Sequence, residues 1–111
     1  MSFVGVGQMG GNAPLLEDGF VSTDELGAMQ TQGAVGEIVG WVFDAEGRYL
    51  EVGTNLRVGS VRIDPRAGAE VIGIAGGPAK IPAIRAALRG RILNGLISDE
   101  DTAPAILVLP D

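Results

Sequence analysis

One short segment combines residue types that bind anions: two consecutive glycines followed closely by a lysine. The segment is Ala75-Gly76-Gly77-Pro78-Ala79-Lys80, and Lys80 is the single lysine of the chain. It follows the apolar stretch Glu70–Ala75, which predicts a buried strand, and it precedes a predicted helix. Glycines let a backbone approach a ligand, and the free N–H groups of a helix start attract anions. We therefore expect Gly76, Gly77 and Lys80 to contact an anion or a sugar phosphate.

The alternative for Lys80 is a solvated surface side chain. A cation near a helix start is unfavourable, because the helix dipole places partial positive charge there. That cost favours a functional reason for this lysine. The segment lacks both the Gly-x-Gly-x-x-Gly fingerprint and the Walker pattern, so the two glycines alone do not indicate a nucleotide site.

Carboxylates and one aromatic residue supply the other candidates. Glu37 stands in the glycine-rich, otherwise apolar segment Gly33–Ile38, either as an ordinary exposed strand carboxylate or as an acceptor for sugar hydroxyls. Asp44 precedes a predicted turn, where Asp is a common residue. The acidic run Asp99–Asp101 indicates helix capping rather than a metal site, because no further ligands accompany it. Trp41 suits core packing better than stacking on a sugar.

The composition excludes several kinds of chemistry. The 111 residues include no Cys and no His, so disulfides, thiolates, histidine-paired nucleophiles and imidazole metal ligands are absent. Fourteen acidic residues oppose eight basic ones, and the net charge of −6 argues against a nucleic-acid surface. We predict no catalytic residue, no metal and no cofactor. Without an apolar run of about 18 residues or a signal-peptide pattern, we expect a soluble cytoplasmic protein.

The elements that position these residues alternate between strand and helix, which predicts an α/β fold. Expected strands span residues 3–7, 37–43, 49–52, 70–75 and 93–97, with a further strand or irregular stretch at 56–63 and a tight turn at 45–48. The first expected helix has Ser22 as its N-cap, Glu25 completing a capping box, and Gly33 as the residue after its end; the others run from about Pro78 to Arg89 and onward from Asp99. The strand–helix–strand–helix order of the last part predicts a right-handed parallel βαβ unit.

Three segments carry a resemblance when taken in order. They are residues 33–38 with Phe43, Asp44 and Gly47; residues 75–77 with Lys80 and 83–90; and residues 96–100 with Thr102 and Ala103. Together they resemble the sugar-binding effector domain of SorC/DeoR-type bacterial transcription regulators. The resemblance implies a Rossmann-like parallel sheet flanked by helices, similar to glucosamine-6-phosphate deaminase and ribose-5-phosphate isomerase. It also implies a sugar or phosphorylated-sugar effector that changes how an oligomer holds operator DNA.

Carried over residue by residue, the resemblance places Glu37 and Lys80 at the ligand. Glu37 would accept hydrogen bonds from hydroxyls and Lys80 would pair with phosphate. The family's helix-turn-helix and the first half of its effector domain have no counterpart, so residues 1–111 are expected to be the C-terminal portion of that domain. DNA would then be bound only through the missing helix-turn-helix. Exposed apolar strand edges would favour a homo-oligomer.

The competing hypothesis is a fragment of a sugar-phosphate isomerase or deaminase. Such an enzyme needs a general base, and Glu37 or Asp44 is the only plausible one in this sequence. We therefore expect a binding module rather than an enzyme.

Overall fold

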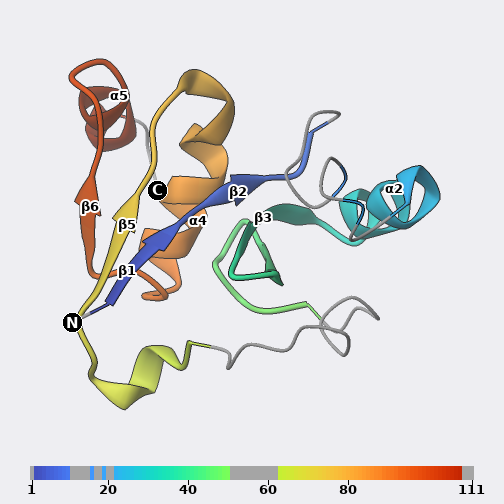
Figure 1. Ribbon diagram of the computed structural model, residues 1–111, viewed down its shortest axis with the longest axis horizontal. Coiled ribbons are helices and arrows are strands. Elements are labelled where there is room, and N and C mark those ends of the chain that lie inside the picture. The colour runs from blue at the N-terminus through green and yellow to red at the C-terminus, as the bar shows by residue number, and fades with distance from the viewer. Residues whose placement is uncertain (1, 11–15, 17–18, 20–21, 51–62, 109–111) are drawn as a thin grey trace.

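The computed structural model describes residues 2–10, 16, 19, 22–50 and 63–108, which form two small sheets joined by helices. Figure 1 labels the elements in chain order. They are β1 (Ser2–Gly5), β2 (Gly7–Gln8), α2 (Thr23–Thr31), β3 (Ala34–Ile38), β4 (Trp41–Asp44), the 3-10 turn η1 (Pro65–Ala67), β5 (Val71–Ile74), the 3-10 turn η2 (Pro78–Lys80), α4 (Ile81–Arg89), β6 (Gly95–Ile97) and α5 (Thr102–Val108).

The first sheet is parallel, with the strand order β1-β5-β6. Ile72 pairs with Phe3 on one side and with Gly95 on the other. Helix α4 connects β5 to β6, so the predicted parallel strand–helix–strand unit is confirmed. Its buried side chains, such as Ile84, join a core with Val71 and Leu93.

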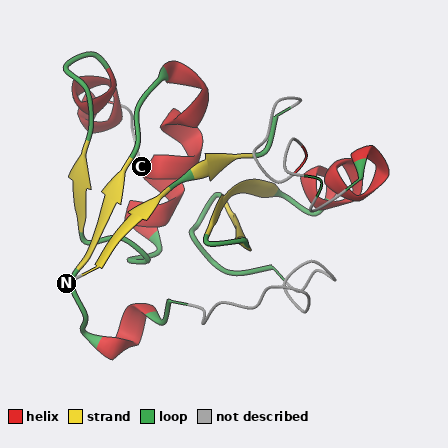
Figure 2. Cartoon of the chain, viewed as in Figure 1, coloured by secondary structure: helices red, strands yellow, loops and turns green. Residues whose placement is uncertain are grey.

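Helices α4 and α5 lie on the same side of this parallel sheet (Figure 2). On the other side, the side chains of Phe3, Ile74 and Ile97 are each about half exposed, at 57%, 51% and 52%. Parallel sheets normally have both faces covered. Among the described residues, the parallel sheet therefore has one packed face and one open apolar face.

The second sheet is antiparallel, with the order β2-β3-β4. The chain passes from one sheet to the other at the buried residue Val6, so the predicted single strand 3–7 is divided between two sheets. A Cβ on Gly36 would meet Ala83 of α4, which shows how closely the helix approaches this sheet. Helix α2 contacts the same sheet through the buried residues Leu26 and Met29.

Several predicted elements are confirmed with small changes of boundary. Strands β5 and β6 fall within the expected ranges 70–75 and 93–97. The expected helix from Pro78 begins as η2 and continues as α4. The capping box of α2 is present, because Ser22 Oγ accepts from Glu25 N and Glu25 Oε1 accepts from Ser22 N, both at 3.1 Å.

The predicted continuous strand over residues 37–43 is wrong. The chain reverses at Val39 and Gly40, and β3 and β4 form a tight hairpin. Tyr49 makes one isolated bridge to Phe43 instead of starting a strand. Residues 51–52 and 56–62 of two other predicted strands lie outside the described residues.

The hairpin turn contains a β-branched residue in the left-handed region. Val39 has φ 47° and Gly40 has φ 90°. A two-residue turn with positive φ at both positions favours Asn-Gly, because Asn tolerates this conformation far better than Val. The β-branched residue also explains why the sequence resembles an unbroken strand.

We predict that Val39→Asn stabilises the protein by about 1 kcal/mol, because it relieves the left-handed strain of a β-branched residue. Urea unfolding followed by circular dichroism measures the change. Val39→Ala is the matched control, since Ala shortens the side chain without the local hydrogen bonding that favours Asn. An Asn variant no more stable than the wild type would contradict the strain argument.

Candidate functional site

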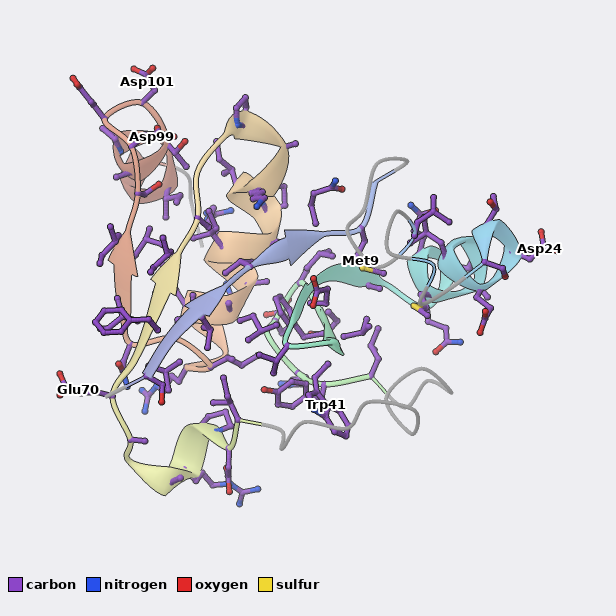
Figure 3. All side chains as sticks on the ribbon, in the orientation of Figure 1. Met9, Asp24, Trp41, Glu70, Asp99 and Asp101 are labelled. Carbon is purple, nitrogen blue, oxygen red and sulfur yellow. The ribbon has the colours of Figure 1, made fainter. Side chains whose placement is uncertain are left out.

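The carboxyl ends of β5 and β6 meet at one edge of the parallel sheet. Beyond β5 lie Gly76 and Gly77, and beyond β6 lies Asp99. In Figure 3 Asp99 lies at this edge, whereas Glu70 lies at the opposite end of β5. Ligands of open α/β sheets bind at the carboxyl edge, so the structure places the predicted glycines where a ligand site is expected.

Both glycines are required by their surroundings. Gly77 has φ 101° and ψ 145°, a conformation that is essentially restricted to glycine. A Cβ on Gly76 would collide with the Asp99 carboxylate. The Gly77 N–H donates to Thr102 Oγ1 at 2.8 Å, and this bond ties the loop after β5 to the start of α5. The double glycine therefore lets two strand ends and a helix start pack together.

Asp99 caps α5, as the sequence predicted. Its Oδ1 accepts the N–H groups of Thr102 at 2.6 Å and Asp101 at 3.1 Å. The backbone hydrogen bond from Thr102, helped by the Thr102 side chain and the N–H groups of Asp101 and Gly77, holds the pKa of the Asp99 carboxyl below its ordinary value of 3.8. The ionised carboxylate of Asp99 is therefore the form that the cap of α5 stabilises.

The start of α4 offers fewer N–H donors than a typical helix start. Pro78 and Pro82 have none. The Lys80 N–H donates to Gly77 O at 3.1 Å, and the Gly77 N–H is held by Thr102. An anion at this edge would therefore depend mainly on the ammonium group of Lys80, a residue that is half-buried and has no ion-pair partner among the described residues.

A cleft of about 350 Å³ lies beside η2 and the start of α4. Its lining residues are Gln8, Met9, Gly10, Gln30, Ala34, Val35, Ala79 and Pro82. Lys80 is not itself a lining residue, but it follows the lining residue Ala79 directly in the chain. Two amide side chains contribute polar atoms: Gln8 Oε1 accepts from Gly10 N, and Gln30 Nε2 donates to Met9 O.

Gln8 and Gln30 are site candidates that the sequence reasoning missed. Gln8 could have been found, because it lies just beyond the first apolar strand, at the same kind of strand end as Gly76. Its side chain is buried, with 8% exposed. Gln30 carries no such signal, because it belongs to α2 and reaches the cleft only through tertiary packing.

Glu37 lies on the other face of the antiparallel sheet. Side chains alternate along a strand, and Gly36 faces α4, so Glu37 faces away from that helix. Its carboxylate lies against Gly7, and Oε2 accepts from Gly40 N at 2.9 Å. Glu37 is buried, with 8% exposed, and it stabilises the β3–β4 hairpin. A direct contact between Glu37 and a ligand stays a prediction.

The remaining polar candidates have structural roles. Asp44 Oδ1 accepts from Glu46 N at 2.9 Å and from Arg48 N at 3.0 Å, which confirms the turn interpretation. Trp41 is half-buried and packs edge-on against Tyr49, with ring centroids 6.4 Å apart. In the part of the chain that the structure describes, no three Asp or Glu residues are grouped so as to hold a metal ion.

Comparison with known proteins identifies the family. A family model described as "Putative sugar-binding domain" matches residues 1–108. The chain belongs to the sugar-binding domain family of SorC/DeoR-type transcriptional regulators.

Two regulators illustrate the similarity in sequence. The chain is 33% identical over 111 residues to the erythritol catabolism regulatory protein EryD of Brucella abortus. This match covers 100% of this chain and 35% of EryD. The chain is also 37% identical over 110 residues to the transcriptional regulator LsrR of an Enterobacter species, a match that covers 96% of this chain and 34% of LsrR. The chain thus spans about a third of the length of these relatives.

The fold is also similar to that of a solved regulator. The full-length sorbitol operon regulator SorC of Klebsiella pneumoniae matches with a TM-score of 0.81 and 26% identity, covering 95% of this chain and 34% of SorC. The mixed α/β architecture with a parallel sheet is therefore that of a regulator's sugar-binding domain. Within the described residues, no helix is long and apolar enough to cross a membrane.

The Asp99 cap predicts a dependence of stability on pH. Because the folded state lowers the Asp99 pKa below 3.8, the cap contributes stability above that value. This contribution is lost as the pH falls through the lower, folded-state pKa. We predict that Asp99→Asn, which keeps a capping oxygen, flattens the fall in unfolding free energy below about pH 4.

Urea midpoints measured between acidic and neutral pH test the cap. Glu100→Gln is the control, because it removes a neighbouring carboxylate and leaves the cap intact. An unchanged acid slope in Asp99→Asn would show that the cap does not contribute.

Proposed function

We propose that this chain is the effector-binding part of a transcriptional regulator, with a sugar or phosphorylated sugar as its ligand. One observation carries the proposal: the single lysine follows the loop at the carboxyl end of β5, and it is next in the chain to Ala79, which lines a cleft that contains amide side chains. In the full-length protein, ligand binding would alter operator affinity through a separate DNA-binding domain.

Each predicted residue has a role in this proposal. Lys80 pairs with the phosphate, and Gly76 and Gly77 let the ligand approach the backbone. The amides of Gln8 and Gln30 hydrogen-bond to hydroxyls. Glu37 orders the hairpin, and it would accept from a hydroxyl only of a ligand that reaches the face of the antiparallel sheet that points away from α4.

We infer that residues 1–111 are the C-terminal portion of the effector domain, in a cytoplasmic regulator. This portion would share the sheet arrangement of glucosamine-6-phosphate deaminase and ribose-5-phosphate isomerase without their activity. The relatives are regulators, and two of them are named for erythritol catabolism and the sorbitol operon. Polyols and their phosphates therefore come first among the ligands to test.

We predict that Lys80→Gln weakens binding of a phosphorylated sugar about tenfold or more, because a desolvated ion pair with phosphate is lost. Binding is measured by NMR titration of the 111-residue chain with erythritol, sorbitol, ribose 5-phosphate and glucosamine 6-phosphate. Arg91→Gln is the control, since it changes the net charge equally at an exposed position outside the cleft.

Two outcomes would contradict the proposal. One is the absence of any chemical-shift change at the cleft with every compound. The other is turnover of either sugar phosphate, which would favour the enzyme hypothesis. Coupling to DNA is tested in a chimera in which this chain replaces the matched residues of EryD, by comparing operator affinity with and without the ligand.

We also propose that two copies pair through the open apolar face of the parallel sheet. Burial of Phe3, Ile74 and Ile97 from both copies would remove half-exposed apolar side chains from water. None of the residues in β1, β5 or β6 is charged, so nothing on these strands opposes pairing.

We predict that Ile97→Glu makes the chain monomeric, because it places a charge in the paired face. Light scattering coupled to size-exclusion chromatography measures the mass over a range of concentrations. Val39→Glu is the control, since Val39 is an exposed apolar residue on the hairpin turn, away from this face. A wild-type chain that is monomeric throughout would contradict pairing.

A further inference from the structure

A second cavity lies at the other end of α4, far from the sheet edge that holds Lys80. It has a volume of about 530 Å³. Its lining residues, which we call the arginine groove, are Glu46, Gly47, Arg48, Tyr49, Asp64, Pro65, Arg66, Arg89 and Gly90. They come from the turn after β4, from η1 and from the C-terminal end of α4. In Figure 1 η1 lies at the opposite end of the molecule from α5.

The walls of the groove are fixed by specific contacts. Gly47 and Gly90 approach so closely that a Cβ on either would meet the backbone of the other. Tyr49 Oη donates to Ile63 O at 2.8 Å, which anchors the chain entering η1. Asp64 Oδ1 accepts from Arg66 N at 2.9 Å and caps η1. The groove is thus formed before any ligand arrives, which lowers the entropic cost of binding.

Three of the seven arginines line this one groove, in a chain with net charge −6. Arg89 is engaged, because its Nη1 lies 3.8 Å from Glu46 Oε2 and donates to Ala45 O at 3.4 Å. The guanidinium groups of Arg48 and Arg66 make neither a hydrogen bond nor an ion pair within the described part of the chain. Two carboxylates also line the groove: Glu46, which is paired with Arg89, and Asp64, which caps η1.

We propose that the arginine groove is a second binding site, for a small molecule that carries an oxyanion group. Guanidinium groups bind phosphate and carboxylate groups through paired N–H donors, and two of them are available here. The volume falls in the range of small-molecule sites, about 300 to 1,000 Å³. A phosphate ester and a polycarboxylate both supply this chemistry.

This site is separate from the proposed effector cleft. The two share no lining residue, and Pro82 of the cleft and Arg89 of the groove are separated by about 10 Å of helix α4. The groove is lined by three arginines and two carboxylates, whereas the cleft presents the amides of Gln8 and Gln30. The anionic group of the ligand therefore dominates selection in the groove.

NMR titration of the 111-residue chain with pyrophosphate and with citrate, at constant ionic strength, tests the groove. We predict shifts at Gly47, Arg66 and Gly90, and affinity reduced about tenfold in Arg48→Gln or Arg66→Gln. Arg91→Gln is the matched control, because it is exposed and lies outside the groove. Stronger binding of pyrophosphate would indicate phosphate esters, and stronger binding of citrate would indicate polycarboxylates.

Lys80→Gln separates this proposal from the effector site, since it should leave the groove shifts unchanged. Two results would overturn the groove proposal. The first is a lack of shifts with both anions. The second is an equal loss of affinity in Arg91→Gln and in the two groove variants, which would indicate attraction by overall charge alone. Circular dichroism of each variant establishes that it folds.

Discussion

The close approach of α4 to the strands and turns around it is the constraint on which the rest of the structure depends. Gly36 lies against Ala83, and Gly47 lies against the backbone of Ala86 and Gly90. At these contacts any side chain would push the helix outward. The approach buries Ile84 completely, and each such side chain contributes about 1.5–3 kcal/mol. Both sheets are thereby held to one helix.

The same helix gives the molecule two different ends. At its start, the loop of Gly76 and Gly77 is tied to Thr102, and Ala79 and Pro82, on either side of Lys80, line the cleft. At its end, the Gly47–Gly90 contact brings the turn after β4 against the helix and forms one wall of the arginine groove. Because α4 is fixed between the sheets, both ends are set by the same packing.

The sequence predicted the parallel unit and the Asp99 cap, because these depend on local signals: apolar runs, glycine pairs and capping residues. It failed at the hairpin, because Val39 has high strand propensity and yet occupies a left-handed turn position. It also missed Gln30, whose place at the cleft comes only from the packing of α2 against the second sheet. Contacts between distant segments have no local signature, so these features needed the structure.

The two proposed sites hold anions by different chemistry. Lys80 offers a compact charge on a flexible stem. The amides of the cleft can hydrogen-bond to hydroxyls, and the glycines let a ligand approach the backbone. Arg48 and Arg66 offer planar, paired donors. A sugar phosphate gains from the first arrangement through both its ring and its phosphate, whereas a plain oxyanion gains most from the second. The chemistry at the two ends of α4 therefore favours two different ligands.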